Sequence, residues 1–466
     1  MRLLVVVLNY RGFFRFVSPI LAELKKQDTN AEIIVLAPDI EQFREGISQL
    51  PYMFIEPAQS NSKFTQKFRQ VRTVLAYLYW SLIGVQSELV LERMGKKFFT
   101  AQAQALADVI KPRQILSLAK FLAFTRTNRF VAKSVFTFLR LLEKLTPADR
   151  RILKQVYDLA PDIIMATPSL YPQHYDVDYI KAGLKSRIPT VSLIASWDHL
   201  SSKGLLSLLP DKLFLWSPHQ IDEAHDFHGV PMNRMQLIGA PSFDWLFDKQ
   251  HLIDRSEFCA KAGFNPALPY ILWAASAPGN CRDEKLVVKL LLEEIRKYSV
   301  LQDYQLLIRP HPNDPAMWKD WSEAGTVVWN TPQFPYKHQE YIDLYNSIYH
   351  AQVVTGLSTS VFLETSILDR PCAIIKQSLA VPETVFNQTL HFKYMVEHGY
   401  PHATENERDF ARWLTRIAQG DDTGRCARAE IVKTLLRPVD VNCPAAEIAA
   451  NAVLNIFESQ SKSSAN

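Results

Sequence analysis

Short apolar runs alternate with helical periodicity along most of the chain. Such runs occupy positions 3–8, 33–36, 161–165, 189–194, 213–216 and 236–238, and a second series follows at 270–275, 304–308, 352–355 and 371–375. Amphipathic helical spacing lies between them, for example at 17–24 and 284–298. Apolar runs of strand length, bounded by turn residues, are typical of strands buried on both faces of a parallel sheet. The pattern therefore predicts an α/β protein with two doubly wound, Rossmann-like domains.

Two stretches depart from this alternation. Residues 64–145 have helical spacing with few strand or turn signals, and helical spacing also dominates after 375, at 408–418, 425–436 and 445–457. Residues 239–244 are interpreted as a linker. The predicted organisation is a first domain at 1–240 with a helical insertion at about 61–155, a second domain at 241–435, and a C-terminal helix with a polar tail at 436–466.

The composition is that of a folded protein with more than one domain. The 466 residues are 47% hydrophobic and 21% charged, and a chain of this length exceeds what a single core supports. The five cysteines are scattered, odd in number and without a Cys-x-x-Cys pair, which argues against a disulfide framework or a zinc site and favours a reducing cytoplasm. The run at 3–8 is short and meets Asn9-Tyr10-Arg11, so we interpret it as the first strand and not as a signal peptide.

Positive charge is concentrated in the helical insertion. Residues 61–154 contain 18 Lys and Arg against 5 Asp and Glu, while the whole chain carries only +4. No window there reaches the roughly 18 uncharged apolar residues that a membrane span needs. Two interpretations stay open: a basic amphipathic surface that lies on an anionic membrane leaflet, or core helices whose lysines extend to solvent. The first implies a cytoplasmic protein bound peripherally to the inner face of the plasma membrane, with no nucleic-acid partner.

The first candidate for anion binding follows the strand at 304–308. Arg309 and His311, in the sequence Arg-Pro-His-Pro, leave the carboxyl end of that strand, where open α/β sheets bind ligands. A guanidinium and an imidazole at this place suit a diphosphate. The alternative is an ordinary strand exit stiffened by two prolines.

A second candidate repeats this layout after the strand at 352–355. Residues 356–360 predict a tight loop, and 361–368 predict a helix whose N-terminus presents N–H groups to an anion. Ser358, Thr359 and Ser360 add hydroxyl donors, and Glu364 is placed to accept a hydrogen bond from a ribose hydroxyl. Serines in front of a helix are also ordinary N-caps, and this alternative stays open.

The most polar loop of the first half follows the strand at 189–194. It reads Ser196-Trp197-Asp198-His199-Leu-Ser-Ser-Lys203-Gly204. A carboxylate beside an imidazole can act as general base on a hydroxyl, and a lysine can neutralise a nearby phosphate. A polar turn with an Asp cap is the alternative, but such a cluster at a strand end favours function. Asp198 is therefore the predicted base, with His199 in reserve and Lys203 as a donor contact.

Two further loops contribute candidates. Arg11 and Arg15 are predicted to lie in the loop after the first strand, where they would meet a phosphate or a sugar carboxylate, or remain solvated. Ser276 and Asn280, in the loop after the strand at 270–275, are added to the donor site. Neither opening loop contains Gly-x-Gly-x-x-Gly or Gly-Lys-Ser/Thr, so a Rossmann glycine turn or a P-loop is not supported.

The motifs of the second half resemble those of bacterial surface-polysaccharide transferases, particularly the CDP-glycerol glycerophosphotransferase and capsule-assembly groups. The similar elements are Arg309-Pro-His311-Pro312, Ser358-Thr-Ser360 ahead of Glu364, and Leu368-Asp-Arg-Pro371. These enzymes have GT-B architecture, with two nucleotide-binding α/β domains that face each other across a cleft. The resemblance implies that His311 and the Ser/Thr loop contact the donor phosphates and that Glu364 holds the ribose.

The match is incomplete in the first half. Glycerophosphotransferases carry a Trp-His-Gly stretch, and here Asp198 replaces its histidine and His199 its glycine. This departure disfavours a CDP-polyol phosphotransferase and favours sugar transfer. Two more functions stay open: a UDP-N-acetylglucosamine 2-epimerase, whose Gly-Thr-Arg opening is absent from this chain, and a non-catalytic, membrane-associated scaffold of the same fold.

The expected protein is a metal-independent, inverting glycosyltransferase. It would move a sugar from a nucleotide-activated donor to a lipid-linked or growing cell-surface glycan, such as capsule or lipopolysaccharide. No cofactor is expected beyond the nucleotide-sugar substrate. In the absence of a DxD motif, cationic side chains and hydroxyls would stabilise the leaving diphosphate.

Overall fold

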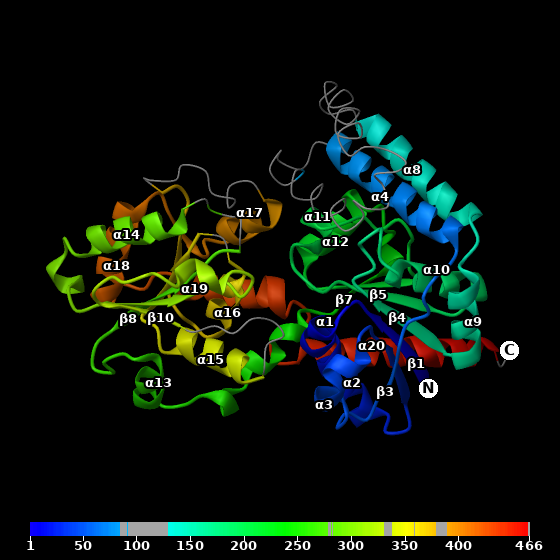
Figure 1. Cartoon of the computed structure of the whole chain (residues 1–466), viewed down its shortest axis with the longest axis horizontal. Coiled ribbons are helices and arrows are strands. Elements are labelled where there is room, and N and C mark those ends of the chain that lie inside the picture. The colour runs from blue at the N-terminus through cyan, green and yellow to red at the C-terminus, as the bar shows by residue number, and fades with distance from the viewer. Residues whose placement is uncertain are drawn as a thin grey trace. The chain divides into compact units, whose positions relative to one another are not determined.

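The computed structural model describes residues 1–83, 91, 129–277, 281, 283–329, 338–357, 359–378 and 389–464. They form two compact units (Figure 1). Unit 1 comprises Met1–Ser242 together with Leu435–Asn466, and unit 2 comprises Phe243–Thr434. The chain therefore leaves unit 1, builds unit 2 and returns to the unit that it began.

In the described residues, unit 1 is built on a seven-stranded sheet with the order β3-β2-β1-β4-β5-β6-β7. All neighbouring strands are parallel. The strands are β1 (Arg2–Val7), β2 (Glu32–Leu36), β3 (Met53–Ile55), β4 (Ile163–Thr167), β5 (Thr190–Leu193), β6 (Lys212–Leu215) and β7 (Met235–Leu237). Because the order reverses between β1 and β4, the carboxyl ends of these two strands form the switch point at which such sheets bind ligands.

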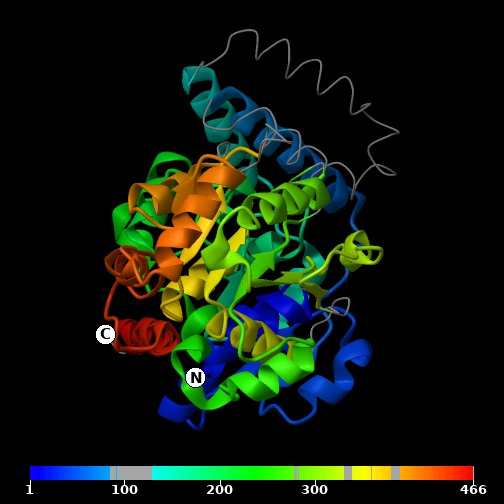
Figure 2. The ribbon, with the colours of Figure 1, turned by 90° about the vertical axis from the view of Figure 1, so that its left-hand side faces the viewer.

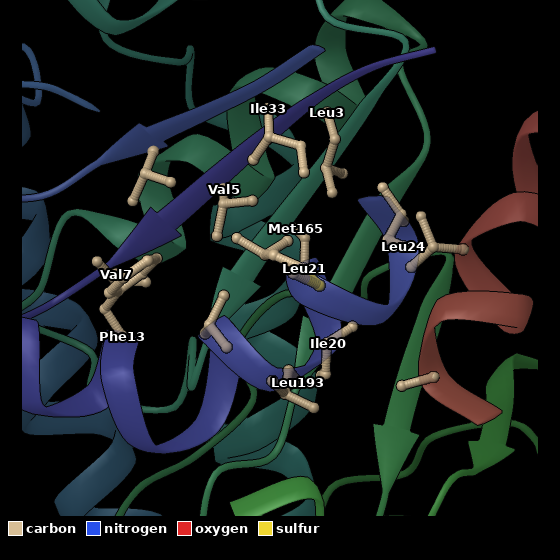
Figure 3. Packing of buried hydrophobic residues seen from close by; sticks show 14 of the residues in the cluster. Leu3, Val5, Val7, Phe13, Ile20, Leu21, Leu24, Ile33, Met165 and Leu193 are labelled. Carbon is tan, nitrogen blue, oxygen red and sulfur yellow. The ribbon is translucent and has the colours of Figure 1, made fainter. Parts of the chain in front are cut away.

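Helices cover both faces of this sheet. On one face, α2 (Ser18–Gln27) and the C-terminal helix α20 (Ala445–Ser464) share a core with alternate residues of β1 (Figure 3). On the other face lie α9 (Arg150–Leu159) and α10 (Asp176–Ser186). Burial on both faces explains why β1 is a continuous apolar run instead of an alternating one.

The described part of the insertion is a pair of helices, α4 (Lys63–Ile83) and α8 (Arg129–Leu145), which lie side by side (Figure 1). Their facing sides form an apolar core that includes Trp80 and Phe136. Trp80 also donates its indole N–H to the carbonyl of Gly204 at 3.1 Å. The inner side of the pair is therefore part of the interior of unit 1.

A buried charge cluster ties the same pair to α10. Arg72 of α4 bonds Glu143 of α8 and lies 3.0 Å from Asp178 of α10. Lys181 of α10 completes the cluster at 3.0 Å from Glu143. All four side chains are buried, so each charge depends on the others for its stabilisation.

In the described residues, unit 2 contains a six-stranded sheet with the order β10-β9-β8-β11-β12-β13. It is also parallel throughout. The strands are β8 (Tyr270–Ala274), β9 (Gln305–Arg309), β10 (Thr326–Val328), β11 (Val353–Gly356), β12 (Cys372–Ile375) and β13 (His402–Thr404). The order reverses between β8 and β11, which places the second switch point there.

The helices of unit 2 lie on both faces of its sheet. On one face are α14 (Glu284–Ile295) and α18 (Glu407–Ala418), the yellow-green and orange helices of Figure 2. On the other face are α13 (Arg255–Ala262) and α15 (His338–Tyr349), where the hydroxyl of Tyr270 donates to the carbonyl of Ser347 at 2.7 Å. The remaining α-helices of the described residues are α1 (Tyr10–Gly12), α3 (Arg44–Ile47), α11 (His199–Ser202), α12 (Pro218–Asp226), α16 (Val361–Ile367), α17 (Leu390–Glu397) and α19 (Arg425–Ile431).

The predicted α/β architecture with two doubly wound sheets is confirmed. The expected loop after β1 is wrong, because Asn9 caps a helix there and its side chain accepts from the N–H of Gly12 at 2.7 Å. The chain continues into a π-helical turn, Phe13–Val17. Arg11 and Arg15 therefore lie on helical turns and not in an open loop. β3, β10 and β13, each of three residues at a sheet edge, were not predicted.

Candidate functional site

Arg309 ends β9 at the carboxyl edge of the unit 2 sheet. It is buried and pairs with Ala274 of β8, the strand beside the switch point. Its guanidinium lies over Trp329, 4.9 Å from the ring centroid, and Trp329 stacks in turn on Phe258 of α13 at 5.7 Å. A stacked guanidinium uses its face for the ring and its in-plane N–H groups for hydrogen bonds. The sequence did not indicate Trp329 as a site residue, because the strand that precedes it was not recognised.

His311 lies two residues beyond the end of β9 and is partly buried. Its Nδ1 accepts a hydrogen bond from the backbone N–H of Asn313 at 3.1 Å. A ring nitrogen that accepts carries no proton, so the proton of the neutral imidazole lies on Nε2. This turn therefore sets the tautomer in which Nε2–H is a donor, as a phosphate contact requires.

The hydroxyls of the loop between β11 and α16 were interpreted either as phosphate donors or as ordinary helix caps, and the structure shows which of them cap the helix. Thr359 Oγ1 accepts from the N–H of Val361 at 3.3 Å, as an ordinary cap does. Ser360 occupies the N-cap position without a side-chain capping bond, and it is exposed. Glu364 is buried one turn further on, and Ser358 lies outside the described residues. Since α16 has only seven residues, its dipole adds little to any anion site.

Gly356, at the end of β11, has a packing role. A Cβ at this position would lie 2.6 Å from the carbonyl oxygen of Ala274, so only glycine allows the two strand ends to approach. Next to it, the hydroxyl of Thr355 is fully buried and has no hydrogen-bond partner among the described residues. An unsatisfied hydroxyl at a switch point is a place where a ligand atom would relieve a cost.

A carboxyl group of the protein accepts hydrogen bonds from the loop after β8. Glu284, at the start of α14, accepts from the backbone N–H of Ser276 at 3.0 and 3.1 Å and from the indole N–H of Trp273 at 3.0 Å. Burial raises the pKa of Glu284 to about 7. The backbone N–H of the predicted donor residue Ser276 is thus already engaged, and Asn280 lies outside the described residues.

In unit 1, Asp198, His199 and Lys203 lie together on and beside the short helix α11. Asp198 Oδ1 accepts from the hydroxyl of Ser196 at 2.7 Å, and Oδ2 lies 2.8 Å from the ammonium of Lys203. The hydroxyl of Ser202 reaches the same carboxylate at 3.3 Å. These donors fix the orientation of the carboxylate.

A second loop, after β4, packs against the Asp198 loop. The ring of Tyr171 lies 6.2 Å from that of His199 and 5.5 Å from that of His174. Burial, and then the charge of Asp198, raise the pKa of Tyr171. Gly204 permits this contact, because a Cβ there would lie 2.1 Å from the carbonyl oxygen of Leu170. Tyr171 and His174 were missed by the sequence reasoning, although the prolines at 168 and 172 mark this stretch as an ordered turn.

The arginines after β1 lie near an aromatic ring and near carboxylates. Arg15 lies with its guanidinium 5.4 Å from the ring of Phe16, while the side chain of Arg11 is outside the description. Burial raises the pKa of their neighbour Tyr10 to about 12, with further contributions from Glu56 and Asp39. Carboxylates therefore share this end of the sheet with the two arginines.

Neither a metal centre nor a membrane span is found in the part of the chain that the structure describes. Within the described ranges, no three His, Cys, Asp or Glu side chains converge in a way that could hold a metal ion. Likewise, none of the helices in that part of the chain has the length and apolar content to cross a bilayer.

Comparison with known proteins places the fold. No protein-family model matches the sequence, and no curated protein matches it. Solved structures do match over nearly the full length. A UDP-GlcNAc 2-epimerase from Neisseria meningitidis, bound to UDP-GlcNAc, has a TM-score of 0.54 at 12% identity, covering 98% of this chain and 100% of that one. S. aureus MnaA, in a co-structure with UDP, has a TM-score of 0.52 at 10% identity, covering 99% and 97%.

A glycosyltransferase from Rickettsia africae is similar to the same degree, with a TM-score of 0.52 at 11% identity, covering 98% of each chain. At these identities the likeness concerns the fold. It does not single out the glycerophosphotransferase type that the sequence motifs suggested. The two parallel sheets and their order match this architecture, and the chain has the two-domain GT-B fold.

Proposed function

We propose that this protein is a nucleotide-sugar-dependent glycosyltransferase in which unit 2 binds the donor. The observation that carries the proposal is His311, whose Nδ1 is engaged by the backbone N–H of Asn313. The tautomer that results makes Nε2–H a donor two residues after Arg309, whose guanidinium stacks on Trp329. Charge-assisted hydrogen bonds from such groups stabilise a diphosphate as it leaves. Ser360 and Glu364 are the proposed contacts to the remainder of the nucleotide.

Unit 1 supplies the acceptor chemistry in this proposal. The acceptor hydroxyl attacks the anomeric carbon, the bond from that carbon to the diphosphate oxygen breaks, and the nucleoside diphosphate leaves. The hydroxyl proton passes to the carboxylate of Asp198, with His199 as the alternative base. Lys203 balances the charge of Asp198 at 2.8 Å. The proposed acceptor is a lipid-linked or growing cell-surface glycan, and the proposed location is the cytoplasmic face of the membrane.

A second candidate, a UDP-N-acetylglucosamine 2-epimerase-like enzyme, is favoured by the solved structures that resemble this fold. Inverting a ring carbon requires the protein to remove and return a proton at that carbon. Glycosyl transfer requires one base at an acceptor hydroxyl. The two reactions therefore differ in whether an acceptor is needed.

The test has two steps. Thermal unfolding is measured with UDP, CDP, GDP and CMP, because a ligand that binds the folded state raises its stability. The nucleotide that stabilises is then supplied as its sugar conjugate, with and without membrane extract. Transfer that depends on the extract supports the proposal, while a changed sugar without any acceptor assigns the epimerase. No stabilisation by any nucleotide would overturn both.

A further inference from the structure

Helix α8 carries two apolar faces. The inner face packs against α4 through Ala132, Phe136 and Leu139, which are buried. A second set of apolar side chains is exposed: Phe130 at 79%, Phe138 at 52%, Leu141 at 50% and Leu145 at 70%. Their spacing of eight, three and four residues places them on one side of the helix, opposite the buried set. We call these four residues the outer stripe.

The outer stripe has no counterpart in ordinary surface helices. A helix that packs on a domain has one apolar face and a charged opposite face, and one that is apolar on both sides is usually covered on both. Isolated exposed apolar residues need no explanation, but four in line along a 17-residue helix do. The opposite side of α8 is already fixed to unit 1, so a rotation of α8 that buries the stripe would break the core contacts of Phe136.

The charges around the stripe are basic. Arg129, Lys133 and Lys144 are exposed on α8. The one acidic residue of α8, Glu143, is buried in its cluster with Arg72. Ser134 and Thr137 are exposed on the same side, and their hydroxyls donate to the backbone carbonyls of Phe130 and Lys133. All exposed charges of α8 are therefore positive and lie beside apolar side chains, the combination that binds an interface of acyl chains and anionic headgroups.

We propose that the outer stripe of α8 docks unit 1 onto an anionic lipid surface, with Phe130, Phe138, Leu141 and Leu145 at the level of the acyl chains and Lys133 and Lys144 at the headgroups. The inference rests on the proposed function for its biological setting, a lipid-linked acceptor, but its physical basis is α8 alone. It also reconciles the two interpretations of the basic insertion, since the inner side is core and the outer side is the membrane surface.

The experiment is vesicle co-sedimentation of the full chain. Vesicles of phosphatidylcholine alone are compared with vesicles that also contain phosphatidylglycerol, at low and high salt. We expect binding only to the anionic vesicles, and weaker binding at high salt because the charges are screened. Phe138→Ser/Leu141→Ser should weaken binding about tenfold or more, and Lys133→Glu/Lys144→Glu about 30-fold or more.

Matched controls separate the stripe from general effects. Met232→Ser removes another exposed apolar side chain of unit 1, and Lys319→Glu/Lys433→Glu makes the same charge change on unit 2. Both controls should bind like the wild type. Thermal stabilisation by nucleotide is measured for every variant in parallel. Loss of vesicle binding with intact nucleotide binding leaves the proposed function unaffected. Loss of nucleotide binding with intact vesicle binding leaves the lipid-docking role of the outer stripe unaffected.

Three results would overturn the proposal. The first is no binding of the wild type to anionic vesicles at low salt. The second is equal binding of the stripe variants and the wild type; if those variants are also less stable, the stripe packs within the protein. The third is a loss of self-association in the stripe variants without any vesicle binding, which would assign the stripe to contact with a second copy of the chain.

Discussion

The carboxyl group of Glu284 lies 3.0 Å from the backbone nitrogen of Ser276, at the end of β8, and Asp176 makes the equivalent bond to Ser169, at 2.7 Å, beyond β4. In both units a buried acid at the start of a helix folds back onto the loop that follows a central strand. Burial raises the pKa of each to about 7. The loops at both switch points are therefore held by groups that change charge near neutral pH.

This relationship predicts how stability depends on pH. Between about pH 4.5 and 7, Glu284 is ionised in the unfolded chain but protonated in the folded one, so the folded state binds more protons and stability falls as pH rises. The fall is of order 3 kcal/mol across that window and ends above pH 7. Glu284→Gln keeps an acceptor for Ser276 without the titration, so its urea-unfolding profile should be flatter and higher at pH 8. Profiles that run parallel would refute this role.

Replacing Asp198 tests the proposed base. Asp198→Asn keeps the shape and an oxygen that accepts from Ser196, but it replaces the oxygen that faces Ser202 and Lys203 with an NH2 donor and removes the basic group. Turnover should therefore fall about 10² to 10⁴-fold with nucleotide binding unchanged. Lys203→Met removes the ion pair and leaves the carboxylate, so its effect should be much smaller. Equal losses in the two variants would mean that Asp198 serves only to position Lys203.

Replacing His311 tests the donor site. Loss of a hydrogen bond to a charged phosphate in His311→Ala should weaken nucleotide binding by about 1.5–3 kcal/mol, measured by calorimetry. Asn313→Ala is the matched control, because the N–H that fixes the His311 tautomer belongs to the backbone and remains. Unchanged affinity in a folded His311→Ala protein would instead favour a structural role for the Arg-Pro-His-Pro turn.

The buried charge cluster predicts an asymmetric response to mutation. Arg72→Met leaves Glu143 buried without its main partner and should lower the free energy of unfolding by about 3–5 kcal/mol. Arg72→Met/Glu143→Leu should recover much of this loss, since Asp178 keeps its ion pair with Arg69 at 2.7 Å and Lys181 keeps its hydrogen bond to the hydroxyl of Thr146. Urea unfolding of the three proteins measures the coupling. Additive losses would show that the charges act independently.

The parts of the structure that depend on local sequence pattern could be predicted from the sequence. The continuous run of β1 and the strand ends at Arg309 and Asp198 followed from apolar periodicity and turn residues, and so did the two-domain α/β class. The partners of those residues did not follow. Trp329 under Arg309 and Tyr171 beside His199 come from separate strands and loops, and nothing in a one-dimensional pattern joins them. Likewise, the hydrogen bond from the Ser276 N–H to Glu284 could not be predicted, because a glutamate at a helix start usually faces solvent.

The return of the chain to unit 1 has a consequence for biosynthesis. Val453 and the neighbouring alanines of α20 pack in the same core as β1, and Ala240 donates its N–H to the carbonyl of Leu436 at 2.8 Å, where the departing and returning segments meet. α2 covers part of this face, so on a ribosome the first half emerges with only the part that α20 covers still exposed, and it must wait until α20 has been synthesised. Unit 2, whose residues are contiguous, can mature during that delay. Nascent chains released before α20 is synthesised would expose apolar residues of the sheet to chaperones and proteases.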